Sequence, residues 1–470
     1  MQNILVYNRK NIIVYLMGFF FYQAVFTQIS QKSPNFIVIL TDDQSWVGTS
    51  FLVDPNDSRS KSDYYVTPNM KRLANMGMRM TNGYAPAPFC SPTRKSILTG
   101  LNPAKHEYQK DRDNWTKKFR KRLTIPKVLK MANPNYITAH FGKWDARYDD
   151  YTPEEMGYDY SDGLTGNNTG GGKQNFEING LTKPYVLGKD WPESIDDPKL
   201  IYSLTNKAID FIEEHSNKNP FFIQISHYAV HLAINHSKKS LENFKENEKG
   251  EKHFIPEFAA MTQDLDNGIG DLLNKIIELN ILKNTYIIFL SDNGGRNSIP
   301  LGPKQIKPRN FPLRDGKGSM YEGGIRVPFV VVGPGVEMNS YTDIPVTGLD
   351  ILPSLADLAG FEIKNLPKII DGGSFRDLIH SKNEKIIKRN DPFLIFHHAA
   401  NRKPESAIRE KNYKLVKNWT DKSLELFDLS KDKEEENDLS SVYPKIVQDL
   451  ETKLISFLNK AKAETKRTKY

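Results

Sequence analysis

A lone cysteine is the residue with the most distinctive chemistry in this sequence. Cys90 is the only cysteine among 470 residues, and it begins the segment Cys-Ser-Pro-Thr-Arg, which ends at Arg94. Residues four apart share one face of a helix, so Arg94 can approach Cys90. By count alone, a buried and inert cysteine is the simpler interpretation. In an exported protein, however, a leftover cysteine is a liability unless it has a function.

Oxygen-bearing side chains follow two apolar runs of the chain. Two carboxylates come after residues 35–41, and a carboxylate and an amide come after residues 285–291. Either pair alone is as readily a turn, because Asp, Asn and Gly favour turns. Together, at the ends of two strands, they favour a site for Ca²⁺ and, less well, for Mg²⁺. The four candidate ligands are Asp42, Asp43, Asp292 and Asn293.

The elements that must position these residues follow from the hydrophobic pattern. Apolar runs alternate with amphipathic segments, which predicts an α/β fold with a mainly parallel sheet covered by helices on both faces. In such a fold the active site lies beyond the carboxyl ends of the strands. Strands are predicted at 35–41, 136–141, 221–226, 285–291 and 328–332. Helices are predicted from Thr67-Pro68, with Thr67 as the cap, and at 123–132, 198–215, 258–282 and 349–359.

The pattern changes near Asn390. Three short alternating stretches predict a small antiparallel sheet, and a last helix is expected over residues 443–463. We therefore expect a large domain over residues 31–385 and a small C-terminal α+β domain over residues 386–470. The three stretches are 393–397, 413–417 and 424–429.

The first 30 residues differ from the rest of the chain. Arg9 and Lys10 precede an apolar run over residues 12–26, which is typical of a signal peptide. The run is short for a membrane span, which needs roughly 20 apolar residues, so we expect no stable span, although a retained anchor is the alternative. We expect residues 1–30 to be removed and the protein to be secreted or periplasmic. An exported chain with one cysteine has no internal disulfide framework.

The segment from Cys90 to Gly100 resembles the signature of the type I sulfatases, a family of the alkaline phosphatase superfamily. Further motifs stand in the order that this family shows, and the resemblance covers residues 34–460. It implies an alkaline-phosphatase-like fold and a sulfuric ester hydrolase. The further motifs are Asp42-Asp43, Gly142-Lys143-Trp144, Ala229-Val230-His231, Asp292-Asn293-Gly294-Gly295, Gly316-Lys317-Gly318 and Tyr321-Glu322-Gly323-Gly324-Ile325-Arg326.

The resemblance implies that a separate maturation enzyme oxidises Cys90 to formylglycine. A hydrated aldehyde offers two hydroxyls on one carbon: one attacks sulfur, and the other then expels sulfate by re-forming the carbonyl. A thiol or a simple alcohol lacks the second hydroxyl. The resemblance also implies that the modified Cys90 joins the ligands of the cation. Those ligands would be Asp42, Asp43, Asp292 and Asn293, and Asp292 could also accept the proton of the nucleophile.

The same resemblance assigns roles to the basic residues of the motifs. Arg94 would orient the aldehyde hydrate and the acidic groups, and Lys143 and Lys317 would bind sulfate. His231 would donate to the leaving-group oxygen. His227, four residues earlier, is the competing histidine, and the motif favours His231.

One position departs from the family pattern. The family usually has Gly-Lys-Trp-His, with a histidine assigned as the base during sulfate release, but this chain has Asp145. The ordinary pKa of Asp is about 3.9 against about 6.5 for His, and its negative charge would repel sulfate. Asp145 therefore either takes over the role of the base or faces the substrate while another group transfers the proton.

The charge and the secretion signal bear on the substrate. A net charge of +8 fits a polyanion such as a sulfated polysaccharide or its oligosaccharides, although a lysine-rich surface also explains it. No nucleic-acid motif is present, so nucleic acid is not expected. Residues 148–191 and 297–314 are expected to be loops that set specificity. The alternatives are a phosphonate monoester or phosphodiester hydrolase of the same superfamily, and an inactive protein that binds sulfated glycans.

Overall fold

The computed structural model describes residues 33–106, 117–145, 151–166, 172–178, 181–187, 196–299, 305–380, 386–399 and 403–466. From Ser33 onward the chain forms one compact unit. The predicted signal peptide at residues 1–30 lies outside the described residues. Within the described part, no helix combines the length and the apolar character that crossing a bilayer requires.

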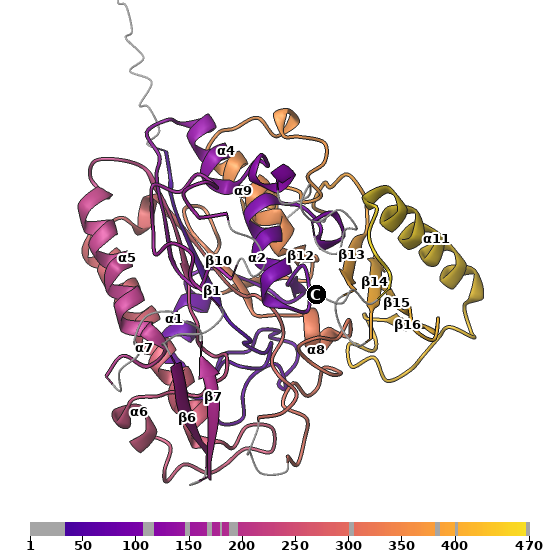
Figure 1. Ribbon diagram of the computed structural model, residues 1–470, viewed down its shortest axis with the longest axis horizontal. Helices are drawn as coiled ribbons and strands as arrows, with labels where there is room; N and C mark the ends of the chain where they lie inside the picture. Colours follow the sequence, from indigo (N-terminus) through magenta and orange to yellow (C-terminus); the bar gives the residue numbers. More distant parts are fainter. Residues whose placement is uncertain are drawn as a thin grey trace, which may run out of the picture. The chain divides into compact units, whose positions relative to one another are not determined.

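A mixed eight-stranded sheet lies at the centre, in the order β11-β2-β10-β9-β1-β8-β4-β5 (Figure 1). Five of its seven neighbouring pairs are parallel, and only β10 runs antiparallel to both of its neighbours. This confirms the predicted α/β fold. Its strands are β1 (Asn35–Thr41), β2 (Met78–Met80), β4 (Ile137–Gly142), β5 (Tyr160–Ser161), β8 (Phe221–Ser226), β9 (Thr285–Ser291), β10 (Phe329–Val332) and β11 (Ser340–Thr342). A separate pair joins β3 (Gly83–Tyr84) to β12 (Val346–Thr347).

Helices cover both faces of this sheet because its central strands are apolar on both sides. Ile37 and Ile39 pack in the cluster that α1, α5 and α7 cover. Phe36, Val38 and Leu40 pack in the cluster that α2, α4, α9 and α10 cover. These helices are α1 (Pro68–Asn75), α2 (Cys90–Thr99), α4 (Ile125–Ala132), α5 (Ile201–His215), α7 (Pro256–Glu278), α9 (Ile351–Leu358) and α10 (Arg376–His380). Two short helices, α6 (Lys238–Glu242) and α8 (Glu322–Ile325), lie in the connections.

Short 3-10 helices complete these connections. One precedes α5 directly, and another precedes α9. They are η1 (Pro103–Lys105), η2 (Pro198–Leu200), η3 (Leu282–Asn284), η4 (Gly348–Asp350) and η5 (Ile363–Asn365).

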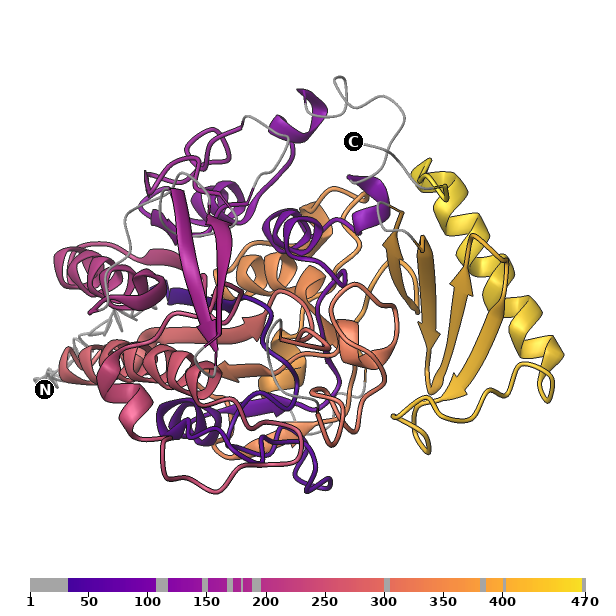
Figure 2. The same ribbon diagram turned by 60° about the horizontal axis from the view of Figure 1, so that its bottom comes forward.

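The predicted antiparallel sheet near the C-terminus is present, with α11 along one of its faces (Figure 2). It contains one strand that the sequence reading missed, β14, whose residues Glu-Ser-Ala-Ile-Arg-Glu carry charged ends around a short apolar centre. We call β13–β16 the C-terminal sheet. Its elements are β13 (Leu394–His398), β14 (Glu405–Glu410), β15 (Tyr413–Asn418), β16 (Leu424–Asp428) and α11 (Pro444–Ala461).

Two local expectations were wrong. Thr67 precedes α1 as predicted, but its hydroxyl makes no cap hydrogen bond and instead accepts one from Ser50 N at 2.7 Å. The predicted loop over residues 148–191 includes an antiparallel hairpin of β6 (Gly172–Ile178) and β7 (Leu181–Leu187). Polar and lysine residues within these strands weaken the alternation on which a strand prediction depends.

The fold makes a prediction about the centre of the sheet. Ile39 is fully buried on β1, between Ile225 and Phe289 of the neighbouring strands. We expect Ile39→Ala to lower the free energy of unfolding by about 2–5 kcal/mol, because it removes buried methyl groups and leaves a cavity. Denaturant unfolding measures the change. The same substitution at Ile277, which is 43% exposed on α7, should cost about 1 kcal/mol or less, and equal losses would contradict the assigned core.

Candidate active site

The candidate metal ligands converge because the strands that precede them are neighbours. β1 and β9 are parallel, and Thr41 lies opposite Ser291. The residues that follow these two strands therefore leave the sheet at the same edge. Asp292 N donates a hydrogen bond to the Thr41 carbonyl at 3.0 Å, and Asp43 N donates to Asp292 Oδ1 at 3.2 Å. These bonds join the two strand ends into one acidic cluster.

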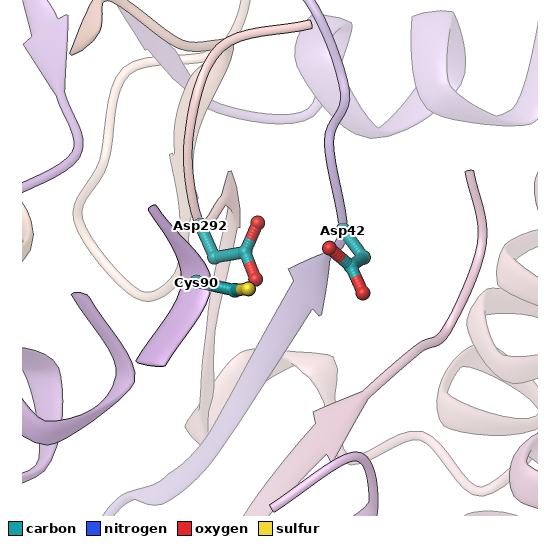
Figure 3. A group of neighbouring side chains, drawn as sticks. All are labelled: Asp42, Cys90 and Asp292. Carbon is teal, nitrogen blue, oxygen red and sulfur yellow. The ribbon is translucent and has the colours of Figure 1, made fainter. Parts of the chain in front are cut away.

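Cys90 lies beside this cluster as the first residue of α2. Its sulfur and one carboxylate oxygen each of Asp42 and Asp292 lie within 4.8 Å of one another (Figure 3). The side chain is 2% exposed. Burial raises the pKa of the Cys90 thiol to about 11, so the unmodified side chain is a neutral thiol at neutral pH. The residues that the sequence analysis grouped into one site thus lie together in the structure, although they are far apart in the chain.

Three buried oxygen atoms of the cluster accept no hydrogen bond from the described residues. They are Asp42 Oδ1, Asp43 Oδ2 and Asn293 Oδ1. Buried polar atoms are nearly always paired, so three such oxygens close together point to a cationic partner. Carboxylate and amide oxygens are the ligands that Ca²⁺ and Mg²⁺ use. The residues predicted from the sequence thus fit a divalent cation.

Burial also changes the acidity of these carboxyl groups. It raises the pKa of Asp42, and it raises the pKa of Asp292 to about 6, with the charge of Asp42 adding to the effect. Burial acts on Asp43 in the same direction, but Lys317 and His231 outweigh it and hold the pKa of Asp43 below its usual value. A bound cation would favour the ionised form of all three groups.

Arg94 connects the nucleophile helix to the acidic cluster. It lies one helical turn after Cys90, and its Nε and Nη2 donate to Asp292 Oδ2 at 2.9 and 2.6 Å. Its Nη1 donates to the carbonyl of Lys143 at 2.8 Å. Arg94 is therefore placed to fix the orientation of Asp292 relative to α2.

Lys143 enters the cluster from the end of β4. Its Nζ lies 2.5 Å from Asp42 Oδ2, and its side chain is fully buried. Burial alone would lower the pKa of Lys143, but the charge of Asp42 outweighs it and raises the pKa, so the ammonium keeps its proton. Gly142 makes this approach possible: its φ is 93°, and a Cβ there would come 2.2 Å from the Ser226 carbonyl oxygen, to which Lys143 N donates at 2.8 Å.

Lys317 comes from another segment, the loop before α8. Its ammonium forms an ion pair with Asp43 Oδ1, and its main-chain N donates to the Gly295 carbonyl at 2.9 Å. Burial opposes its charge, but Asp43 raises the pKa of Lys317 above its usual value. Both predicted sulfate-binding lysines are thus charged and aimed at the acidic cluster.

Of the two candidate histidines, His231 lies at the cluster. Its Nε2 is 3.9 Å from Asp43 Oδ2, while Nδ1 donates to the Leu232 carbonyl. Burial and the nearby lysines hold the pKa of His231 well below 6.5, so the ring is neutral. Asp42, Asp43 and His231 also have ligand atoms within 4.8 Å of one another. The main-chain N of His227 instead donates to the Leu40 carbonyl, and burial lowers the pKa of His227 to about 4.

Asp145 also belongs to the cluster. Its carboxylate Oδ2 lies 3.8 Å from Lys143 Nζ, and the residue is 1% exposed. Its φ of 54° is in the left-handed region, which Asp tolerates better than most residues. Its charge acts on the thiol of Cys90 and on Arg94. The structure therefore brings this departure from the family pattern to the centre of the site.

The sequence reading missed Lys199. This lysine is fully buried, and its positive charge is one of the causes that lower the pKa of His231. Lys199 and Leu200 both have left-handed φ values, 57° and 54°, immediately before α5. The turn residues Asp-Asp-Pro before Lys199 predict a break at the start of a helix, but they do not reveal that the break directs a lysine inward.

Comparison with known proteins identifies the family of this chain. The family described as Sulfatase matches residues 34–361, more than half of the chain. The chain belongs to the sulfatase family. This sulfatase is a sulfuric ester hydrolase of the alkaline phosphatase superfamily. A second family description, N-sulphoglucosamine sulphohydrolase, C-terminal, matches residues 315–462.

Named relatives share most of the length of the sulfatase. A protein named Sulfatase from Formosa agariphila is 29% identical over 88% of this chain and 86% of its own. N-acetylglucosamine-6-sulfatase from Homo sapiens is 28% identical over 71% of this chain, which spans 62% of the human protein. Among solved structures, Ps i-CgsB in complex with k-i-k-neocarrahexaose is similar with a TM-score of 0.70 at 24% identity, over 91% of this chain and 93% of the other. The last likeness shows the fold.

The unpaired oxygens lead to a prediction about the cation. We expect Ca²⁺ to raise the unfolding temperature of chelator-treated sulfatase, because an ion that binds only the folded state adds about 2.7 kcal/mol at 100 times its Kd. Asp42→Asn removes one ligand charge and should reduce this rise. Calorimetry with and without Ca²⁺ measures both effects. Asp271→Asn, an exposed position on α7, should keep the full rise, and an undiminished rise in Asp42→Asn would contradict the assigned site.

Proposed function

We propose that this sulfatase is secreted and hydrolyses sulfate esters of a sulfated polysaccharide or of its oligosaccharides. Its nucleophile would be a formylglycine hydrate made from Cys90, and a divalent cation would be bound beside it. The observation that carries the proposal is the meeting of Cys90 with Asp42 and Asp292 within 4.8 Å. A nucleophile position beside hard oxygen ligands, with charged lysines around it, suits an ester of an oxygen-rich anion.

The chain's own residues divide the work at the nucleophile. A bound cation, held by Asp42, Asp43, Asp292 and Asn293, would lower the pKa of the nucleophile and balance the charge of sulfate. Arg94 holds Asp292 through two hydrogen bonds. Asp292 is therefore fixed in orientation next to residue 90, where its carboxylate can accept the proton of the attacking hydroxyl.

Lys143 and Lys317 bind the sulfate oxygens in this proposal. Each ammonium already pairs with a carboxylate that belongs to the cation site, Asp42 or Asp43. Both ammonium groups are therefore next to the proposed cation ligands, where a sulfate group beside residue 90 would meet them. Charged donors in a buried site stabilise the anion and its transition state more strongly than they would in water.

His231 serves the leaving group. Its Nδ1 donates to the Leu232 carbonyl, and we assign Nε2 as the atom that exchanges a proton with the substrate. The neutral ring must therefore acquire a proton on Nε2 before it can give one to the departing oxygen.

Related observations support the proposed substrate class, ion and location. Relatives named for N-acetylglucosamine 6-sulfate and a structural neighbour bound to a neocarrahexaose support a sulfated carbohydrate substrate. Three carboxylates and an amide oxygen in one site support Ca²⁺ ahead of Mg²⁺, because Mg²⁺ usually keeps several waters and binds through only one or two carboxylates. The basic and apolar segment over residues 1–30 supports export, and a formylglycine at Cys90 would require a maturation enzyme as partner.

The nucleophile can be tested by mass and by turnover together. We expect the proteolytic peptide that contains Cys90 to have the mass of an aldehyde when the protein is made with a maturation enzyme. Sulfate release from a sulfated oligosaccharide should then rise in proportion to the aldehyde fraction. Cys90→Ser supplies only one hydroxyl, so it should keep sulfate bound and fail to turn over.

Three outcomes would contradict this proposal. Full turnover by protein with an unmodified thiol would remove the formylglycine. Faster release of phosphate than of sulfate from matched esters would favour the phosphonate or phosphodiester alternative, and fully modified protein that binds sulfated glycans without turnover would favour the binding alternative.

Asp145 yields a separate prediction. If its carboxylate is the base for sulfate release, Asp145→Ala should lower kcat by about 10²-fold or more, with a smaller change in KM. Asp145→His restores the residue usual in the family and should keep measurable turnover, with a pH profile shifted towards the higher pKa of histidine. Steady-state kinetics across pH measure both variants. Full turnover by Asp145→Ala would rule out the base role and leave a role in facing the substrate.

A further inference from the structure

The C-terminal sheet uses its two faces for different contacts. The side chains on one face pack against α11, and these are Ile395, Ile408, Leu415 and Leu426. The side chains on the other face pack in a cluster with Tyr84, Met320 and Ile325. They are Leu394, Phe396, Ala407, Val416 and Phe427. Met320 and Ile325 lie just after Lys317. The second face of the sheet therefore packs against the segment that carries a candidate sulfate-binding residue.

We define residues 314–322 as the Lys317 loop. On the side of the active site, Lys317 N donates to the Gly295 carbonyl at 2.9 Å, and Gly318 N donates to the Pro88 carbonyl at 3.0 Å. The loop is thus tied directly to the chain after Asn293 and to the chain before Cys90. A shift of this loop would therefore change the distance between the Lys317 ammonium and the Asp43 carboxylate.

The C-terminal residues hold the same loop from its other side. Arg314 donates to Glu425 at 3.3 Å and to the carbonyl of Glu435 at 3.0 Å, and Tyr321 donates to Glu425. Glu322 N donates to Glu435 Oε2 at 2.6 Å. These contacts lie both before and after Lys317, so they fix the loop at both ends.

A buried ion cluster is the centre of this contact. Lys414 Nζ of β15 lies 2.9 Å from Glu322 Oε1 and 2.8 Å from Glu435 Oε1, and all three side chains are fully buried. Tyr84 donates to the second carboxylate oxygen of Glu322 at 2.7 Å. Removing Lys414 would leave Glu435 without this ion pair and Glu322 with the more distant Arg326, 3.6 Å from its Oε2, which is unfavourable in a buried site. The cluster therefore stabilises the observed position of Glu435, whose carboxylate accepts the hydrogen bond from Glu322 N.

We propose that Lys414 and Glu435 are positioning residues of the sulfate-binding site. Through Glu322 they hold the Lys317 loop so that the ammonium of Lys317 stays at Asp43. The C-terminal sheet then helps to position a sulfate-binding residue, although none of the residues of this sheet touches the reacting atoms. This inference rests on the proposed role of Lys317 in binding sulfate.

A double-mutant cycle separates positioning from general stability. The variants are Lys414→Met, Lys317→Ala and the double mutant. For each we would measure the dissociation constant of inorganic sulfate from the Ca²⁺-loaded protein. We would also measure kcat and KM for a sulfate ester that the wild-type enzyme hydrolyses. We expect Lys414→Met to weaken sulfate binding by about tenfold or more and to raise KM more than it lowers kcat. In the Lys317→Ala background the same substitution should have almost no further effect, because it acts through Lys317.

The chain offers a matched control on the same strand. Lys417 lies three residues after Lys414 on β15, on the face towards α11, where its Nζ pairs with Glu451 at 2.6 Å. Lys417→Met breaks an ion pair of the C-terminal sheet without touching the Lys317 loop, so it should leave sulfate binding within about twofold of wild type. If Lys414→Met yields no folded protein, Glu435→Gln, which keeps the side-chain volume, takes its place in the cycle.

Each outcome decides the inference. Equal losses in both backgrounds, or a loss no greater than that of Lys417→Met, would show that the cluster is merely structural. Full sulfate binding by Lys317→Ala would instead remove the proposed role of Lys317, and the inference with it. The first result leaves the proposed function intact, whereas the second does not, so the two failures are distinguishable.

Discussion

The balance of buried charge at the ends of β1 and β9 is the constraint on which the rest of the site depends. Three carboxylates meet there with exposed fractions of 3% or less. Left alone, they would repel one another and lose hydration, which costs several kcal/mol per ion. Three basic side chains from three different segments offset this negative charge, and each pairs with a different carboxylate. The pairs are Arg94 with Asp292, Lys143 with Asp42, and Lys317 with Asp43.

This balance explains why distant parts of the chain have to meet accurately. Arg94 is delivered by the first turn of α2, Lys143 by the end of β4 and Lys317 by a loop whose far side rests on the C-terminal sheet. The sheet order places β1 between β9 and β8, so the acidic ends and the histidine segment are adjacent by construction. Each of these basic side chains therefore lies against one of the carboxylates that would hold the proposed cation.

Much of this could be predicted from the sequence, for definite reasons. The strands around Ile39 and Ile288 are long apolar runs bounded by polar residues, so their limits are clear in the chain. The order of the motifs located Cys90, Asp292 and Lys317 in the chain. The rule that active sites lie beyond the carboxyl ends of parallel strands predicted that the acidic residues after these strands meet at one edge of the sheet. What could not be predicted depends on backbone geometry or on contacts between distant segments. Lys199 is buried in a left-handed turn of the main chain, a conformation that its sequence neighbours do not specify.

The C-terminal contacts illustrate the same limit. Lys414 and Lys417 are indistinguishable by type, and only strand register decides which one faces Glu322 and which one faces α11. A one-residue change of register would exchange them. The register of β15 is set by its pairing with β14. β14 is also the strand of this sheet that the sequence analysis did not predict.

The burial of Cys90 has a consequence for the order of events in the life of the chain. In the folded protein the sulfur is 2% exposed, at the first turn of a helix whose preceding residues are hydrogen-bonded to Gly318. An enzyme that oxidised this residue would have to reach a side chain that the folded protein encloses. If Cys90 is modified as we propose, the modification would therefore precede the folding of this part of the chain. Protein that folded first would keep the thiol, which lacks the second hydroxyl that the proposed reaction uses.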